Sequence, residues 1–525
     1  MSTVVGTTPL VRYALRRDRV LAGVWLLVLV LVCYASAAAT PGLYPTVRER
    51  VVAAEAINAS PAIVALYGPI LDVRSLGEVA MTKMTVLYAV FVAVMFLILV
   101  RRHTRVEEEN GQTELIGGTA VGRDAPLAAA VTEAAVVAAV LGLLAAVVNV
   151  AAGLPVAGSL AFGASWAGVG LVAAGGTALA CQFSASARTC AAIAAAGIGV
   201  AFGLRAVGDT TVSWLSWLSP FGWSTQLRAY GETRWWVLLL YVALAGALTG
   251  LAQLVRSRRD LGSGVLTARP GPAEGSSRLS NAIALCVRVH TAMLVAWTVA
   301  TAVMGVVLGA IAPQVGDLLT SPSARAMMER LGGVGAMQET LVAAELSVSA
   351  VVVCCFGIAV VAHGGTDEHD GRTEQVLATA TSRSYSFIAT FVVALFGSTW
   401  LLLVAGTAVA VGYGTAGSFG ALVAAALAQA PAVWLVTALA AVCFALRSTW
   451  TYVAWGLLVA FVTLGQIGEL LQLPARVLDL SPFNHVPSMP VEDFAATPEL
   501  VLTLLAVVLA VGAWARYRSR DITAS

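Results

Sequence analysis

HTRVEEENGQTELIGGTAVGR at His103–Arg123 and HGGTDEHDGRTEQVLATATSR at His363–Arg383 are two copies of one stretch. They lie 260 residues apart, and without any gap eight of their 21 positions are identical. Chance would give roughly one or two identities in such a window. Each copy follows the second strongly apolar segment of its half, so we interpret one half of the chain as a structural duplicate of the other. The identical pairs are His103/His363, Glu108/Glu368, Gly111/Gly371, Thr113/Thr373, Glu114/Glu374, Thr119/Thr379, Ala120/Ala380 and Arg123/Arg383.

The composition places the chain in a membrane. Apolar residues make up 59% of it, charged residues only 11%, and the mean hydropathy is +0.85. A soluble chain of this composition would expose large apolar patches. Segments of about 17 to 25 apolar residues, the length that a bilayer crossing requires, occur six times in each half. They lie near residues 21–39, 85–101, 127–151, 158–180, 189–206 and 235–255, and near 290–312, 343–363, 387–411, 419–443, 450–469 and 497–515.

We therefore predict an all-α polytopic membrane protein with twelve transmembrane helices, arranged as two parallel six-helix repeats. Because six is even, both repeats have the same topology and are related by an axis along the membrane normal. A second pair of matching segments, WLSPFG at 217–222 and DLSPFN at 479–484, follows the fifth span of each half. A Ser-Pro pair after an apolar span ends the helix there.

The distribution of Lys and Arg predicts the orientation. With the N-terminus inside, the inward segments hold 21 of the 31 Lys and Arg residues, so both termini are expected in the cytoplasm. Arg12, Arg16 and Arg19 fall on one stripe of residues 8–19, which is typical of a helix in the inner membrane interface or of a simple positive anchor. We expect the first span to remain uncleaved. The preference for Arg, with spans of Ala, Val, Leu and Gly, indicates a high-GC bacterium and hence a bacterial plasma membrane.

Three domains follow from these patterns. Residues 1–255 form the first six-span half, with the N-terminal interfacial helix and the loop at 103–123. Residues 256–283 are basic and then rich in Gly, Pro and Ser, which indicates a cytoplasmic linker. Residues 284–525 form the second half, with the loop at 363–383. The longer outer segments 40–84 and 313–342 are expected to form small extracellular caps.

The duplicated loops are acidic. A helix would place Glu107 and Glu114 on one ridge, and Asp367 and Glu374 on another. The inner leaflet is itself negative, so an acidic ridge is better suited to a basic groove on a soluble partner than to lipid. The alternative is a solvated helical turn that only caps the spans, but retention of sequence in both loops favours a shared contact.

These loops resemble those of the membrane subunits of type-2 ATP-binding cassette exporters, in particular the fused twelve-span permeases of the polyketide-antibiotic or tetronasin type. The resemblance rests on the E-E-x-x-G-x-T-E loop that ends at Arg123, its copy that ends at Arg383, the S-P-F turns and the run SPAIVALYGP at 60–69. In that family the loop after the second span is the coupling helix that docks on the nucleotide-binding subunit. The resemblance thus implies docking roles for residues of both loops. They are Glu107, Glu108, Gly111, Thr113, Glu114 and Arg123 in the first, and Asp367, Glu368, Gly371, Thr373, Glu374 and Arg383 in the second. The copies differ at Gln112/Arg372 and at Glu109/His369, so the sequence leaves open whether the two docking contacts are equivalent.

The chain has no ATP-binding loop of its own. A Walker A loop needs G-x-x-x-x-G-K-[ST], and the single lysine, Lys83, lies in MTKMT. We expect a transport subunit that is not itself an enzyme and carries no cofactor. ATP and Mg²⁺ would bind to two copies of a separate ATPase, and the exported compounds would be drugs, antibiotics or lipids.

Other polar residues are weaker candidates. Glu133, Asn149 and Gln182 lie within or at the end of apolar spans, where they either line a substrate pathway or pair between helices. A metal site at His363, Asp367 and His369 is not expected, because the first copy lacks matching ligands.

Two other classes of protein remain open. A proton-coupled secondary transporter can also be built from six plus six spans, but its major-facilitator form carries a basic loop where this chain is acidic. A membrane enzyme would have to rely on His485, Glu492 and Asp493, which have no counterparts in the first half.

Overall fold

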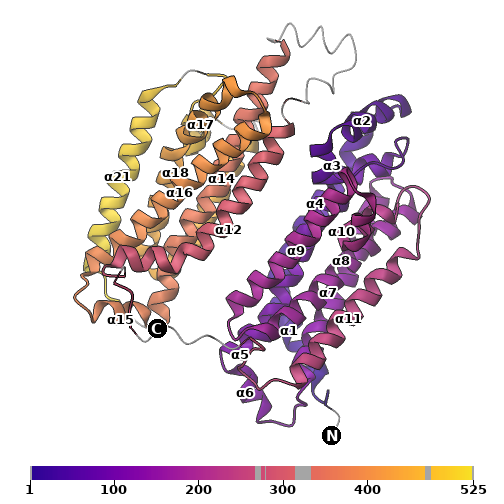
Figure 1. The fold of residues 1–525 in the computed structure, drawn as a ribbon, viewed down its shortest axis with the longest axis horizontal. Helices are drawn as coiled ribbons and strands as arrows, with labels where there is room; N and C mark the ends of the chain where they lie inside the picture. The colour runs from indigo at the N-terminus through magenta and orange to yellow at the C-terminus, as the bar shows by residue number, and fades with distance from the viewer. Residues whose placement is uncertain are drawn as a thin grey trace. The chain divides into compact units, whose positions relative to one another are not determined.

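The computed structural model describes residues 3–266, 274–277, 279–311, 313, 333–467, 474–492 and 494–522, and within these ranges the regular secondary structure is helical, without strands. The chain divides into two compact units, Met1–Gly271 and Pro272–Ser525 (Figure 1). Eleven helices in the described ranges are long and apolar enough to cross a membrane. The prediction of an all-helical polytopic membrane protein is therefore confirmed. The twelfth predicted span, 450–469, coincides with a shorter apolar helix, so twelve spans in two repeats stays a prediction.

The first unit holds six of the spanning helices. They are α1 (Thr7–Leu43), α4 (Leu76–Arg101), α7 (Ala125–Ala151), α8 (Val156–Phe183), α9 (Ala187–Thr210) and α11 (Val237–Ser257). The shorter helices are α2 (Val47–Ala59), α3 (Pro61–Tyr67), η1 (Arg102–Val106), α5 (Glu107–Glu109), α6 (Gln112–Gly117), η2 (Ser213–Leu218) and α10 (Pro220–Gln226).

The second unit holds helices in a similar order. They are α12 (Ala282–Ile311), α14 (Gly333–His369), α15 (Arg372–Leu377), α16 (Arg383–Tyr413), η4 (Ala416–Ser418), α17 (Phe419–Ala428), α18 (Ala430–Leu446), η5 (Ser448–Trp450), α19 (Thr451–Ile467), α20 (Ala475–Leu478), η6 (Pro482–His485) and α21 (Ala496–Ser519). Helices α17 and α18 together make one spanning segment.

Small residues allow the helices to pack closely. A Cβ atom on Gly142 of α7 would lie 2.6 Å from the carbonyl oxygen of Gly163 of α8. In the second unit, a Cβ on Gly305 of α12 would lie 2.7 Å from the Cβ of Ala408 on α16. Membrane helices associate largely by van der Waals packing, which small residues at the interface improve. The glycines among the apolar spans thus fix which helices touch.

The first outer segment has the helical content that its sequence indicates. Thr46 and Glu49 form a capping box at the start of α2, in which each side chain bonds to the backbone of the other residue. Arg205 is fully buried and donates to the carbonyl oxygens of Val64 (3.1 Å) and Ala65 (2.6 Å). These bonds hold α9 against the end of α3, where the backbone N–H of Gly68 also donates to the Val64 oxygen (2.8 Å). Most of the second outer segment, residues 314–332, lies outside the described residues.

The N-terminal end of the first half differs from one expectation. Residues 8–19 are helical, but they form the first turns of α1 and are continuous with the span rather than a separate helix. The division between the units falls within the predicted linker, 256–283. The backbone N–H groups of Val265 and Leu266 donate to the carbonyl oxygens of Gln182 (3.0 Å) and Phe183 (2.8 Å). This part of the predicted linker therefore packs on the first unit.

Candidate coupling loops

The two duplicated loops have the same backbone shape. In the first unit, α4 continues through η1 and α5, the chain turns at Gly111, and α6 follows. In the second unit, α14 runs to His369, the chain turns at Gly371, and α15 follows. Gly111 has φ 72° and ψ 0°, and Gly371 has φ 70° and ψ 6°. This left-handed conformation is strained for most other residues, which explains why glycine stands at both positions.

The predicted acidic ridge is therefore wrong in its geometry. We expected one helix to carry Glu107 and Glu114 on a single face, but the turn at Gly111 divides the loop into two short helices. The carboxylates on either side of the turn differ in exposure as well. Glu107 is buried, whereas Glu114 is exposed.

A buried ion pair anchors the loop of the first unit. Arg259, just beyond α11, donates to both carboxylate oxygens of Glu108 at 2.6 and 2.8 Å. Glu108 also pairs with Arg105 (2.9 Å) and accepts from the backbone N–H of Gly262 (2.8 Å). Arg123 at the end of the loop donates to the carbonyl oxygen of Arg259 (2.9 Å). These contacts of Glu108, Arg259 and Arg123 thus hold both ends of the loop against the chain just beyond α11, the last span of the first unit.

The second unit repeats this arrangement. Arg520, just beyond α21, donates to both carboxylate oxygens of Glu368 at 2.5 and 2.6 Å. Arg383 at the end of the loop donates to the carbonyl oxygen of Arg520 (3.0 Å). We call each set of three residues a clasp: Glu108, Arg259 and Arg123 in the first unit, and Glu368, Arg520 and Arg383 in the second. Two-oxygen contacts between arginine and carboxylate fix orientation as well as distance.

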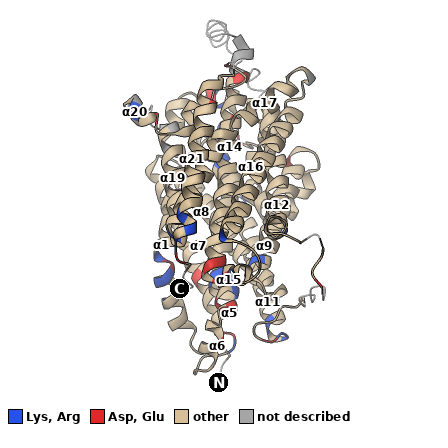
Figure 2. Cartoon of the chain, turned by 90° about the vertical axis from the view of Figure 1, so that its left-hand side faces the viewer, with Lys and Arg blue, Asp and Glu red and all other residues tan. Residues whose placement is uncertain are grey.

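The clasps leave one face of each short helix uncovered. Thr113 and Thr373 are buried against the unit that carries them, whereas Glu114 and Glu374 are exposed. Leu115 is 79% exposed, which is unusual for a leucine outside an apolar environment. Figure 2 shows that charged residues gather around α5, α11 and α15, while most of each long helix carries none. The uncovered faces of α6 and α15 are therefore available for a partner.

The surroundings of the two loops are unequal. In the first unit, Glu107 contacts Arg17 and His103, each at 2.9 Å. In the second, Asp367 pairs with Arg372 at 2.7 Å. Arg372 also pairs with Asp370 at 2.7 Å, and these contacts, that with Asp367 first, raise the pKa of Arg372 above its usual value.

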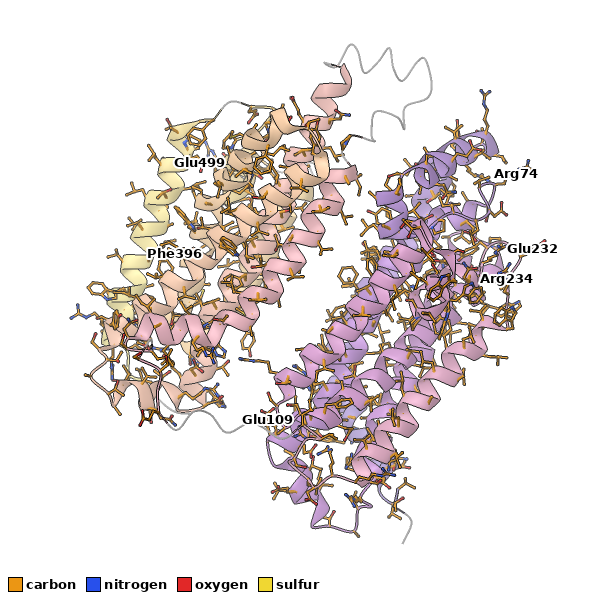
Figure 3. All side chains as sticks on the ribbon, viewed as in Figure 1. Arg74, Glu109, Glu232, Arg234, Phe396 and Glu499 are labelled. Atoms are coloured by element: carbon orange, nitrogen blue, oxygen red, sulfur yellow. The ribbon has the colours of Figure 1, made fainter. Side chains whose placement is uncertain are left out.

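The residues predicted to dock thus fall into two groups. Glu107, Glu108 and Glu368 are buried in ion pairs, and Arg123 and Arg383 bind backbone carbonyls. Glu114 and Glu374 remain exposed. Glu109, labelled in Figure 3 at the end of α5, accepts from the backbone N–H of Ala187 at 3.1 Å and so joins the loop to α9.

The three candidate pathway residues are all buried within the first unit. The side-chain amide of Asn149 donates to the Tyr230 hydroxyl (2.9 Å), and the side-chain oxygen of Gln182 accepts from Arg259 (2.8 Å). Glu133 lies 3.6 Å from His103. Each therefore has a neighbour within the unit, and contact with a substrate stays a prediction.

Sequence reasoning missed Arg259, Arg520 and Asp18. The two arginines are 261 residues apart and each follows the last span of its half, so a search near the 260-residue offset that allowed a shift of one residue would have paired them. Asp18 lies in the helix that precedes the first apolar run, and no local pattern separates it from an ordinary flanking charge.

Comparison with known proteins gives two matches. The family model for the C-terminal domain of the multidrug efflux system permease Rv1217c matches residues 279–518. The chain is also 39% identical over 529 residues to the multidrug efflux system permease protein Rv1217c of Mycobacterium tuberculosis. That alignment covers 99% of this chain and 96% of the relative.

Proposed function

Because the chain belongs to the family of the multidrug efflux system permease Rv1217c, we propose that it is the membrane permease of an ATP-driven exporter of hydrophobic or amphipathic compounds, such as drugs, antibiotics or lipids. ATP and Mg²⁺ bind to a separate ATPase subunit, present in two copies. The permease itself is not an enzyme. It resembles the type-2 class of ATP-binding cassette exporters.

The observation that carries this proposal is the pair of clasps. Both loops are tied to the end of the last span by a buried carboxylate and two arginines. A loop that only capped a span would not need the same buried ion pair twice. A loop that transmits force needs such an anchor, because a displacement of its exposed helix must be passed on to the spans.

The proposed mechanism uses these contacts as a rigid joint. The ATPase dimer closes on ATP and moves α6 and α15 through their exposed faces. Each clasp passes the movement to α11 or α21 as well as to the helix before the loop. The movement of both halves then drives the transport cycle. The excess of arginine at the loop side predicts that this side and both termini face the cytoplasm.

The test is to co-express the chain with the products of its neighbouring genes and purify it in detergent. The bound ATPase and its vanadate-sensitive hydrolysis are then measured. The same is done with a Glu114→Arg, Glu374→Arg double variant. Both side chains are exposed, so the double variant is expected to fold. Charge reversal against a basic groove costs several kcal/mol, and we expect at least about a tenfold loss of bound ATPase.

The matched control is Glu232→Arg. Glu232 is exposed and lies at the opposite end of the same unit (Figure 3). This variant should retain the ATPase. A wild-type chain that purifies without an ATPase and moves substrate on a proton gradient would replace the proposal with a secondary transporter.

A further inference from the structure

Three acid or imidazole side chains meet inside the first unit, next to the first loop. Asp18 comes from α1, His103 from η1 and Glu133 from α7. Asp18 and Glu133 are each 1% exposed and His103 is 5% exposed. One ligand atom of each lies within 4.8 Å of the other two. We propose that Asp18, His103 and Glu133 form a binding site for one divalent transition-metal ion of the Zn²⁺ type.

The distances suit such an ion. His103 Nε2 lies 3.0 Å from Asp18 Oδ2 and 3.6 Å from Glu133 Oε2. Nitrogen and oxygen ligands bind Zn²⁺ at about 2.0–2.2 Å, which separates neighbouring ligands of a tetrahedral site by about 3.3–3.6 Å. The two separations from His103 Nε2 are thus within a few tenths of an ångström of those in a tetrahedral site, and the ligand atoms of Asp18 and Glu133 lie within 4.8 Å of each other. Imidazole favours zinc and similar ions over Mg²⁺ or Ca²⁺.

A second carboxylate orients the histidine. Glu107 Oε1 lies 2.9 Å from His103 Nδ1, and Asp18 Oδ2 lies 3.0 Å from Nε2. With an ion bound, Nδ1–H donates to Glu107 and the lone pair of Nε2 faces the ion. Metal-binding histidines commonly donate their other N–H to a carboxylate in this way. Glu107 is held in turn by Arg17 at 2.9 Å. Arg102 lies 3.2 Å from the other oxygen of Asp18, which leaves Oδ2 for the ion.

An unsatisfied atom points independently to a ligand. Glu133 is fully buried, and its Oε1 has no hydrogen-bond partner among the described residues. The 3.6 Å separation between Oε2 and His103 is too long for a hydrogen bond. A buried carboxylate oxygen without a hydrogen bond is costly, and a cation bound to this carboxylate reduces that cost.

The site is expected in the first half only. At the repeat offset of 260 residues, Val393 stands in place of Glu133. His363, which matches His103, lies beside Asp367 and the ring of His290. One ion per chain is therefore expected. The alternative is an ion-free charge cluster, in which a protonated His103 and two neighbouring arginines balance three carboxylates.

The experiment uses the full chain, purified without a polyhistidine tag and stripped of metal. It is loaded with Zn²⁺, and bound metal is counted by mass spectrometry. Loading with Co²⁺ then gives an absorption spectrum that reports coordination. We expect about one ion per wild-type chain and a tetrahedral Co²⁺ spectrum. Glu133→Gln and His103→Gln should abolish both, and Glu107→Gln should weaken Zn²⁺ affinity about 10- to 100-fold.

His363→Gln is the matched control and should keep one ion per chain. Size-exclusion profiles and circular dichroism confirm that each variant is folded. Zn²⁺ should also raise the melting temperature of the wild type but not that of Glu133→Gln. A folded wild type that binds no ion would overturn the proposal in favour of the charge cluster. Binding that survives Glu133→Gln unchanged would overturn it as well.

Discussion

The two clasps are expected to differ in how much stability each contributes. In the described part of the chain, Arg520 is the one ion-pair partner of Glu368, and the side chains are 10% and 4% exposed. Arg520→Ala therefore leaves a buried carboxylate without a countercharge, which costs about 3–5 kcal/mol. Arg520 also lies over the rings of Phe444 and Tyr517, each centred 5.3 Å from its guanidinium carbon, so lost packing adds to the cost.

Arg259→Ala should cost less. Glu108 would keep Arg105 at 2.9 Å and the backbone N–H of Gly262 at 2.8 Å. Only one charged hydrogen-bonding partner is lost, which corresponds to about 1.5–3 kcal/mol. The second clasp is thus predicted to be the more fragile by roughly 2 kcal/mol.

The assay is thermal unfolding in detergent, followed by fluorescence-detected size exclusion. For units of this size, about 1 kcal/mol corresponds to roughly 2–4 °C in melting temperature. Arg520→Ala should therefore lower it by about 6–20 °C and Arg259→Ala by about half as much. Arg516→Ala is the control, because Arg516 is exposed in the last turn of α21, just before Arg520, and its substitution should change the melting temperature little.

A double substitution separates lost charge balance from lost packing. Glu368→Leu combined with Arg520→Leu removes both charges, and such replacements are often neutral or stabilising. The double variant should have a higher melting temperature than the Arg520→Ala variant. The prediction fails if the Arg520→Ala and Arg516→Ala variants have the same melting temperature. It also fails if the double variant melts at a lower temperature than Arg520→Ala. Either result would show that the buried ion pair does not contribute the stability assigned to it.

Two further predictions concern glycines. Gly111→Val should lower the free energy of unfolding by about 1–2 kcal/mol, because φ is +72° at this position. Gly117→Ala is the control, since its added Cβ has open space around it, and it should be neutral or slightly stabilising. Equal melting temperatures of the two variants would contradict the assigned turn. Gly163→Val should disrupt the packing of α7 on α8 and reduce the yield of folded protein, because its Cβ would meet the backbone of Gly142. Gly176→Ala in the same helix, which has no neighbour within 4 Å, should fold normally, and a normal yield of Gly163→Val would refute the close contact.

The sequence predicts the helices well because their cause is local. A run of about 20 apolar residues forms a membrane helix whatever its neighbours are. The turn in each loop was also visible, since Asn110-Gly111 and Asp370-Gly371 are common turn pairs. The prediction of an acidic ridge was wrong because it relied on helical spacing and not on these turn pairs.

The partners of the buried charges were not predictable in the same way. Glu108 and Arg259 are 151 residues apart, and their pairing depends on which spans lie side by side. Glu133 stood out as a carboxylate in an apolar run, but nothing near it in sequence indicates His103 or Asp18. Duplication makes such partners easier to find, because a residue needed in both halves recurs at a nearly constant offset of about 260 residues.

Crosslinking from the exposed faces of α6 and α15 tests the central claim most directly. Leu115→Cys and Gln375→Cys, both at exposed positions, would be labelled with a photoreactive maleimide in membranes that contain the co-expressed neighbouring ATPase. Arg74→Cys, at the opposite end of the first unit (Figure 3), is the control. The account predicts adducts with the ATPase from both loops and none from position 74. Adducts with the ATPase only from position 74, or none from either loop although the ATPase copurifies, would contradict it.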